Sequence, residues 1–359
     1  MDTLNVELGS RSYPILIDAG LISRPEVYEA LGARDVLIVS NTTVAPLYLR
    51  PLRAGLGARR ALEVILPDGE AHKTLANAAR VLDVLIANRF GRDCAVLALG
   101  GGVVGDLAGF VAATLFRGIP VVQVPTTIVA MTDAAIGGKT AVDLPAGKNL
   151  VGAFWQPRLV ACATDTLRTL PARERRAGFG ELWKYALLDG RDLWRAVATC
   201  APWAAAGEGA EPPYELPDVI DRAIAYKAAT VGRDERERTG HRALLNLGHT
   251  VGHAIESATG MLHGEAVALG LVAACRVSAA VAGAAPELGT EVAAALADSG
   301  LSNDIASYLT DDVLARIAVD KKRIGRKLRF IVIREVGRCE PVDITVDELR
   351  RILRPVRGT

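Results

Sequence analysis

Short apolar segments alternate with amphipathic stretches through the first half of the chain. The short segments, which predict buried strands, are 34–40, 61–67, 94–99 and 120–124. Two stretches, 74–88 and 106–115, have apolar residues at the spacing typical of helices. Because strands that alternate with helices usually form a parallel sheet covered on both faces, we expect an α/β domain with a mainly parallel sheet.

After residue 171 the pattern becomes mostly helical. The stretches with helical spacing are 173–188, 220–232, 242–258, 265–282 and 290–297. The Ala-, Gly- and Pro-rich stretch 201–217 is typical of an exposed connection, and 330–334 predicts a late strand. The expected fold class is therefore α/β plus all-α, with a Rossmann-like domain over residues 1–167 and a mostly helical domain over residues 168–359.

Composition and charge exclude several classes of protein. Hydrophobic residues make up 50% of the chain without an uninterrupted apolar run of membrane-spanning length, and the net charge is +1. We therefore expect neither a nucleic-acid partner nor a membrane partner. The amino terminus lacks the pattern of a signal peptide, and the five cysteines show no CxxC spacing. Both observations favour a reducing, cytoplasmic location.

A glycine-rich segment, residues 98–110, joins a predicted strand to a predicted helix. Its sequence, ALGGGVVGDLAGF, leaves backbone N–H groups and a helix amino terminus open to an anion such as a pyrophosphate. The glycines are not in GxGxxG register, so a simple tight turn is the alternative. Glu70, in a Pro-Asp-Gly turn, is either an acceptor for ribose hydroxyls or a solvated turn carboxylate.

Glycines also precede two lysines in residues 125–157. Lys139 follows Gly137-Gly138, and Lys148 follows Gly147. Together with Arg117, these lysines form either a lining for phosphate or carboxylate or an ordinary cationic surface loop.

Three of the five histidines fall within fifteen residues, at His249, His253 and His263. Read as one helix, residues 242–258 place Arg242, Asn246, His249, His253 and Glu256 in a single polar stripe on an otherwise apolar cylinder. Two imidazoles one turn apart can bind one metal ion such as zinc, and satisfied core histidines are the alternative. The spacing is not the metalloprotease motif HExxH, because the inner residues supply no glutamate.

Taken together, the motifs resemble the 3-dehydroquinate synthase family of sugar-phosphate cyclases. The matching segments, in the order of that family, are GGGVVGDLAGF, VPTT, GGKTAVDLPAGKNLVGAFWQP, GELWKY, DERE, RALLNLGHTVGHAIE, HGEAVALG and DKK. They extend from about residue 67 to residue 329. Each motif alone is weak, but the ordered set is specific.

The resemblance implies a role for many individual residues. It implies a divalent metal, zinc or cobalt, held by Glu181, His249 and His263, which makes His253 a proton-transferring residue and not a ligand. The other residues with implied catalytic roles are Lys139, Lys184 and Asn149. Implied substrate contacts are Arg117, Asp133, Lys227, Glu237, Arg242, Asn246 and Lys322 or its neighbour Lys321. Implied contacts to NAD are Asn41, Glu70, Lys73, Gly101, Gly102, Val103, Asp106, Thr126, Thr127 and Lys148.

The implied activity is conversion of 3-deoxy-D-arabino-heptulosonate 7-phosphate, a phosphorylated keto acid, to 3-dehydroquinate and phosphate. The family uses transient oxidation by NAD, β-elimination, reduction and an intramolecular aldol closure, and it implies a homodimer. Four features depart from the family pattern: Ala134-Ala135, Asp143, Trp183 and one additional residue between Glu237 and Arg242. An aminodehydroquinate synthase-like cyclase of secondary metabolism and a metal-dependent NAD alcohol dehydrogenase are the alternatives.

Overall fold

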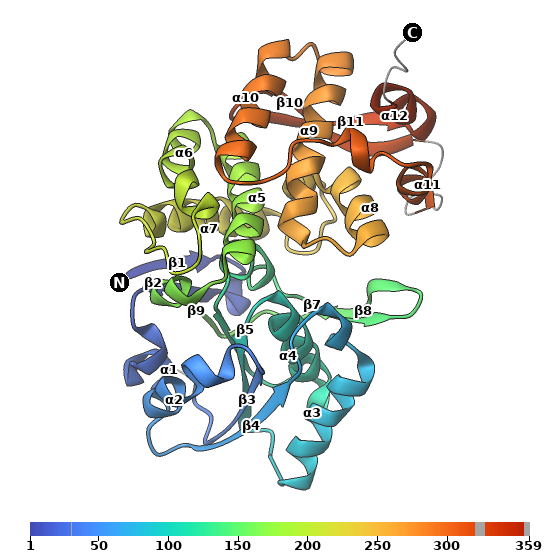
Figure 1. Ribbon diagram of the computed structural model, residues 1–359. Coiled ribbons are helices and arrows are strands. Elements are labelled where there is room, and N and C mark those ends of the chain that lie inside the picture. The colour runs from blue at the N-terminus through green and yellow to red at the C-terminus, as the bar shows by residue number, and fades with distance from the viewer. Residues whose placement is uncertain (30, 320–326, 355–359) are drawn as a thin grey trace. The chain divides into compact units, whose positions relative to one another are not determined.

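The computed structural model describes residues 1–29, 31–319 and 327–354 of the chain. The chain divides into two compact units (Figure 1). The first unit contains Met1–Leu170 and Lys227–Arg236, and the second contains Pro171–Tyr226 and Glu237–Thr359. The division cuts helix α7 (Leu216–Arg233), so that the carboxyl end of this helix belongs to the first unit.

A seven-stranded sheet forms the centre of the first unit, in the order β1-β2-β9-β6-β5-β3-β4. Its strands are β1 (Asp2–Val6), β2 (Tyr13–Asp18), β3 (Asp35–Asn41), β4 (Arg60–Leu66), β5 (Cys94–Gly100), β6 (Val121–Pro125) and β9 (Leu159–Ala163). Only the β1–β2 pair is antiparallel, and every other pair in the sheet is parallel. A separate hairpin pairs β7 (Lys139–Leu144) with β8 (Gly147–Phe154).

Both faces of this sheet are buried under helices. Helices α1 (Pro25–Glu29) and α2 (Ala45–Gly55) cover one face, and α3 (Leu75–Ala87) and α4 (Gly102–Thr114) cover the other (Figure 1). Alternate residues of β5 enter the two cores, Val96 one of them and Leu97 the other. A strand buried on both faces has to be apolar throughout, which explains the continuous apolar sequence of 94–99.

The second unit is built around a long buried helix, α9 (His263–Ala282). It packs against α5 (Ala172–Asp189), α8 (His249–Thr259), α10 (Pro286–Asp298), α12 (Val346–Leu353) and the hairpin of β10 (Lys327–Glu335) and β11 (Arg338–Thr345). Helices α6 (Arg191–Ala205) and α11 (Asp311–Val319) complete the unit. Among the described residues, α9 is the one helix of membrane-spanning length and apolarity. Its most apolar 18-residue segment is 72% buried, as in a core helix.

The fold class and most of the predicted elements are confirmed. The predicted strands correspond to β3, β4, β5, β6 and β10, and the predicted helices at 74–88, 106–115, 173–188, 220–232, 265–282 and 290–297 correspond to α3, α4, α5, α7, α9 and α10. The prediction for 201–217 is wrong in part, because residues 201–205 end helix α6 and Trp203 is buried.

The prediction of one helix over 242–258 is wrong. A short 3-10 helix covers His241–Asn246, and α8 begins only at His249. Gly248, between them, has a φ of 77°, a left-handed conformation that ends a helix. Helix α9 approaches this turn so closely that residue 270 has to be glycine, since a Cβ on Gly270 would lie 1.9 Å from the Gly248 carbonyl oxygen.

Candidate active site

A fully buried carboxylate in the second unit lies beside two imidazoles. Glu181, on α5, has its Oε1 atom 3.5 Å from His249 Nε2 and 3.3 Å from His263 Nε2. Its other oxygen pairs with Lys184, one turn further along the helix. His249 and His263 are the first residues of α8 and α9, so the two helix starts bring them together.

His253 completes a cluster of three histidines. The three rings each offer a nitrogen such that all three nitrogens lie within 4.8 Å of one another. Three imidazoles and one carboxylate are ligands that suit zinc and its neighbours, so these residues fit a divalent metal. His253 is exposed, whereas His249 is buried.

Hydrogen bonds on the far side of two rings fix which nitrogen faces Glu181. The Nδ1 atom of His249 donates to the Leu247 carbonyl at 3.0 Å, and that of His263 donates to Glu256 Oε2 at 3.0 Å. On both rings, Nε2 is therefore the nitrogen that faces Glu181, and it would bind a metal ion once deprotonated. Two other glutamates near the cluster have different partners: Glu256 orients His263, while Glu265 is bound by Arg173 at 2.9 Å.

The two rings have opposite pKa shifts. Burial lowers the pKa of His249 to about 3. Burial also opposes protonation of His263, but hydrogen bonds to Glu181 and Glu256 outweigh it and raise the pKa of His263 to about 10. At neutral pH, before a metal binds, the His249 ring is neutral with one N–H, whereas both nitrogens of His263 are protonated and its ring is positively charged.

Zinc binding at pH 7 should therefore release about one proton, because a metal ligand must be deprotonated. Protons compete with zinc for His263 more strongly as the pH falls below about 10, because the pKa of this ring is raised. The affinity for zinc should therefore decrease as the pH decreases. Calorimetry in buffers of different ionisation enthalpy measures the proton count. A proton count of zero at pH 7 would contradict this protonation state.

Glycines bring the helices that carry the cluster unusually close together. A Cβ on Gly180 would lie 2.0 Å from the Gly264 carbonyl oxygen, and a Cβ on Gly264 would lie 1.7 Å from the Ala177 carbonyl oxygen. Gly180 precedes Glu181 and Gly264 follows His263, so backbone contact between α5 and α9 sets the distance between the two side chains.

Gly264→Ala should force α5 and α9 apart, lowering the free energy of unfolding by about 3 kcal/mol and weakening metal binding. Urea unfolding and metal titration measure the two effects. Gly289→Ala in α10 is the matched control, since its Cβ would meet only Cys275 at 3.8 Å, and a helical Ala is expected to be neutral or stabilising. Equal stability of both variants would refute the importance of this contact.

Other predicted site residues of the second unit lie before α8. Arg242 is buried, and its Nε atom lies 3.4 Å from Glu237 Oε1. Glu237 has a φ of 55° and Gly240 a φ of 88°, both in the loop where the sequence suggests an additional residue. Asn246 is exposed at the end of its 3-10 helix. Lys321 and Lys322 lie outside the described residues.

In the first unit, Lys227 donates to both the carbonyl and the Oδ1 atom of Asp133, each at 2.5 Å. Lys139 begins β7, and its side chain is exposed. Asn149 has a φ of 56°, and its backbone N–H donates to Asp143 Oδ1 at 2.8 Å. Arg117 is also exposed.

The glycine-rich segment forms a cradle at the carboxyl end of β5. Helix α4 begins at Gly102, earlier than predicted, so Val103 lies in its first turn and N–H groups of that turn face outward. A Cβ on Gly102 would lie 3.1 Å from the Ala134 Cβ, and one on Gly101 would lie 3.4 Å from Thr127 Cγ2.

Thr126 adds a polar group to this region. Its Oγ1 atom is buried and has no hydrogen-bond partner within the described residues. A buried hydroxyl that lacks a partner is costly, so a ligand hydroxyl or phosphate oxygen would satisfy it. Gly101, Gly102 and Thr126 thus fit the phosphates and hydroxyls of a dinucleotide.

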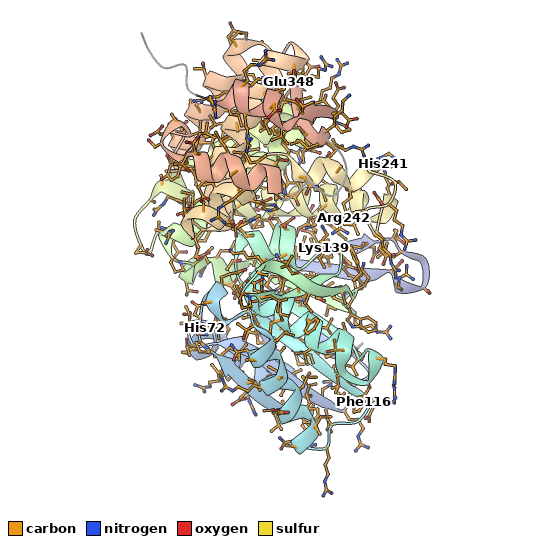
Figure 2. All side chains as sticks on the ribbon, turned by 90° about the vertical axis from the view of Figure 1, so that its right-hand side faces the viewer. His72, Phe116, Lys139, His241, Arg242 and Glu348 are labelled. Carbon is orange, nitrogen blue, oxygen red and sulfur yellow. The ribbon has the colours of Figure 1, made fainter. Side chains whose placement is uncertain are left out.

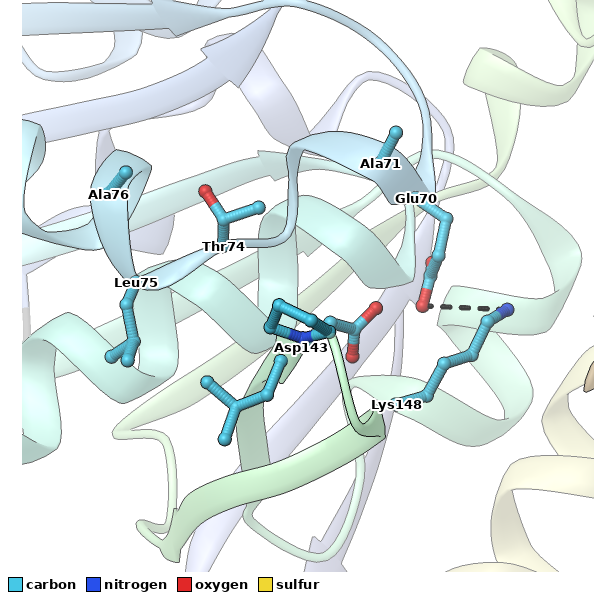
Figure 3. Close-up of a pocket in the computed structure, with 9 residues that line it drawn as sticks. Glu70, Ala71, Thr74, Leu75, Ala76, Asp143 and Lys148 are labelled. Atoms are coloured by element: carbon cyan, nitrogen blue, oxygen red, sulfur yellow. Dashed lines mark ion pairs between the residues drawn. The ribbon is translucent and has the colours of Figure 1, made fainter.

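A network of charges surrounds the buried Lys73. Its Nζ atom lies 2.8 Å from Glu70, 3.3 Å from Asp106 and 3.8 Å from Asp143. Glu70 also pairs with Lys148 at 3.8 Å, at the edge of an open cavity of about 660 Å³ (Figure 3). Burial raises the pKa of Asp106 to about 6, although Lys73 counteracts it. Glu70 is therefore part of a network and not an isolated turn carboxylate.

Of the remaining predicted NAD contacts, Asn41 donates to Asp68 Oδ1 at 2.6 Å, at the end of β3. Sequence reasoning missed the roles of Glu256 and Asp143. Glu256 belonged to the polar stripe, and that position was the available signal.

Comparison with known proteins shows which family the chain belongs to. The model of the 3-dehydroquinate synthase N-terminal domain matches residues 63–177, and that of the C-terminal domain matches residues 178–323. A 3-dehydroquinate synthase of Methylococcus capsulatus is 44% identical over 98% of this chain and 99% of its own length. The chain belongs to the 3-dehydroquinate synthase family. A further member, from Pseudomonas putida, is 45% identical over 96% of this chain and 94% of its own length.

Solved structures of related cyclases have the same fold. A 2-deoxy-scyllo-inosose synthase, complexed with carbaglucose-6-phosphate, NAD+ and Co2+, has a TM-score of 0.87 and 26% identity, and the match covers 98% of this chain and 99% of that one. A 2-epi-5-epi-valiolone synthase from Streptomyces hygroscopicus subsp. jinggangensis, with NAD+ and Zn2+ bound, has a TM-score of 0.84 and 27% identity over 95% of both chains. The family resemblance expected from the motifs is confirmed.

Proposed function

We propose that this enzyme converts 3-deoxy-D-arabino-heptulosonate 7-phosphate to 3-dehydroquinate and phosphate, with NAD oxidising the substrate and NADH reducing the intermediate within one turnover. The observation that carries the proposal is the buried Glu181 carboxylate beside the His249 and His263 rings, in a chain 44% identical to a 3-dehydroquinate synthase over nearly its full length. Cyclisation with release of phosphate therefore leaves no net change in the cofactor.

Glu181, His249 and His263 would hold the divalent metal. Bound there, the metal would supply Lewis acidity that lowers the pKa of a substrate hydroxyl. Glu256 keeps the His263 ring oriented through its 3.0 Å hydrogen bond, and the Leu247 carbonyl does the same for His249. Fixed ligands lose little freedom when they bind, which favours both affinity and alignment.

His253 accepts and returns the hydroxyl proton at the ring nitrogen that faces the cluster. An imidazole exchanges protons near neutral pH, and His253 is exposed enough to meet a substrate. Its position one turn after His249 in α8 places it beside the metal ligands without requiring it to be one.

The substrate carries a carboxylate and a phosphate, and the predicted contacts supply cations for both. Positive charge would come from Arg117, Lys139, Lys227, Arg242, Lys184 and Lys322. Hydrogen-bonding groups would come from Asn149, Asn246, Asp133 and Glu237. Lys227 is held by Asp133, and Arg242 lies beside Glu237, so these cations are oriented before substrate arrives. NAD would bind along Gly101–Asp106, Thr126, Thr127, Asn41 and the network of Glu70, Lys73 and Lys148.

The proposal is tested by comparing two substrates in one phosphate-release assay, the heptulosonate phosphate and its amino analogue. We expect the heptulosonate phosphate to be turned over with the higher kcat/KM. A preference for the amino analogue would assign the enzyme to secondary metabolism. The dehydrogenase alternative is not favoured, since the relatives that match nearly the whole chain are 3-dehydroquinate synthases. A probable glycerol dehydrogenase from Sinorhizobium meliloti, at 18% identity and a TM-score of 0.69, is similar in fold alone.

We also propose a cytoplasmic homodimer without nucleic-acid or membrane partners. The near-neutral net charge of +1 and the five cysteines without CxxC spacing support the location and the absence of these partners, and membership of the family suggests the dimer. Light scattering during size-exclusion chromatography measures the oligomeric state, and a monomeric mass would overturn the dimer.

A further inference from the structure

Three consecutive residues after α4 have left-handed backbone conformations. Phe116 has a φ of 52°, Arg117 a φ of 68° and Gly118 a φ of 127°. Glycine adopts such angles freely, but residues with a Cβ do so only at a cost, and a bulky residue such as Phe is especially rare there. A chain reversal at a helix end usually needs only one such residue, most often glycine. Two non-glycine residues in sequence therefore call for contacts that hold them.

Trp155 holds this segment from one side. Its indole ring lies so close to Gly118 that a Cβ on Gly118 would be 2.1 Å from the ring atom Cη2. The indole Nε1–H donates to the carbonyl of Ile119 at 2.9 Å. The Trp155 side chain therefore fixes Gly118 and Ile119, the two residues that follow Arg117.

Arg92 is a second anchor of the segment. Its Nη1 atom donates to the Phe116 carbonyl at 3.1 Å, and its Cζ atom lies 5.4 Å from the centroid of the Phe116 ring. Phe116 lies at the edge of the first unit (Figure 2). Both neighbours of Arg117 are thus anchored, while the side chain of Arg117 is exposed.

We infer that Trp155 and Arg92 are positioning residues that hold the guanidinium of Arg117 where it receives an anionic group of the substrate. This inference rests on the proposed function, which gives Arg117 a phosphate or carboxylate to bind. A guanidinium is a planar fork that binds such groups in a defined orientation, so a fixed backbone improves its fit. Backbone strain retained at a binding residue is a recognised feature of functional sites.

The inference is tested by a double-mutant cycle with Trp155→Leu, Arg117→Met and the double variant. Trp155→Leu should raise KM for the heptulosonate phosphate about tenfold and change kcat by less than about twofold, because it acts on binding. Arg117→Met should raise KM at least as much. The double variant should resemble Arg117→Met alone, since Trp155 acts through Arg117.

Additive effects of the two substitutions would overturn the inference, as would an unchanged KM in Arg117→Met. If Trp155→Leu fails to fold, Trp155→Phe and Arg92→Met test the same two anchors with smaller changes. Trp203→Phe is the matched control: its indole also donates to a carbonyl, that of Ala210 at 3.0 Å, and KM should not change. Failure of this inference leaves wild-type phosphate release intact, whereas failure of the proposed function removes it.

Discussion

Glu181→Gln should lose its metal and its activity together while keeping its fold. Glutamine has the same size as glutamate but no charge, and Glu181 Oε1 lies within 3.5 Å of both His249 Nε2 and His263 Nε2. Lewis-acid stabilisation is worth several kcal/mol, so we expect turnover to fall by about three orders of magnitude. Elemental analysis, circular dichroism and phosphate release measure metal content, fold and activity.

Glu265→Gln is the matched control for this substitution. Glu265 lies two residues after His263, but its carboxylate is bound by Arg173 at 2.9 Å and also accepts from the Leu262 N–H. We expect this variant to keep its metal and most of its activity. Full metal content and normal turnover in Glu181→Gln would sink the assignment of Glu181 as a ligand.

Gly102→Val should greatly weaken the binding of NAD. Even a Cβ at this position would lie 3.1 Å from the Ala134 Cβ, and the two methyl groups of valine would fill the space before the first turn of α4. We expect the Kd for NAD to rise about 100-fold, equivalent to about 2.7 kcal/mol. Fluorescence titration with NADH measures this affinity, and metal content should remain normal because the cluster lies in the second unit.

Gly207→Val provides the comparison. Gly207 is exposed, and a Cβ there would meet no atom within 4 Å, so the same added volume should leave NAD affinity unchanged. A thermal melt excludes unfolding as the cause in Gly102→Val. Unchanged NAD affinity in a folded Gly102→Val protein would refute the role of the cradle.

The sequence pattern predicted strand β5 most directly. Strand β5 is buried on both faces and is apolar throughout, so its pattern has one interpretation. The break at Gly248 was not predictable from periodicity, because a left-handed φ leaves no trace in the spacing of apolar residues. Helix α6 was not among the predicted elements, and its carboxyl end contains Pro202, a residue more typical of connections.

The candidate site shows the same division between local and long-range information. The spacing of His249 and His253 already suggested a metal, because both lie one turn apart on one helix. Glu181 lies far away in sequence, and only the close packing of α5 and α9 through Gly180 and Gly264 brings it to these rings. The role proposed for Glu181 could therefore be predicted from the family motif and not from spacing.

One measurement tests directly whether the cyclisation is redox-neutral. The metal-loaded enzyme is incubated with the heptulosonate phosphate and a small fraction of one equivalent of NAD, while released phosphate and NADH absorbance are followed together. We expect one phosphate per substrate molecule without accumulation of NADH. Steady accumulation of NADH, or no phosphate from enzyme with full metal content, would contradict it.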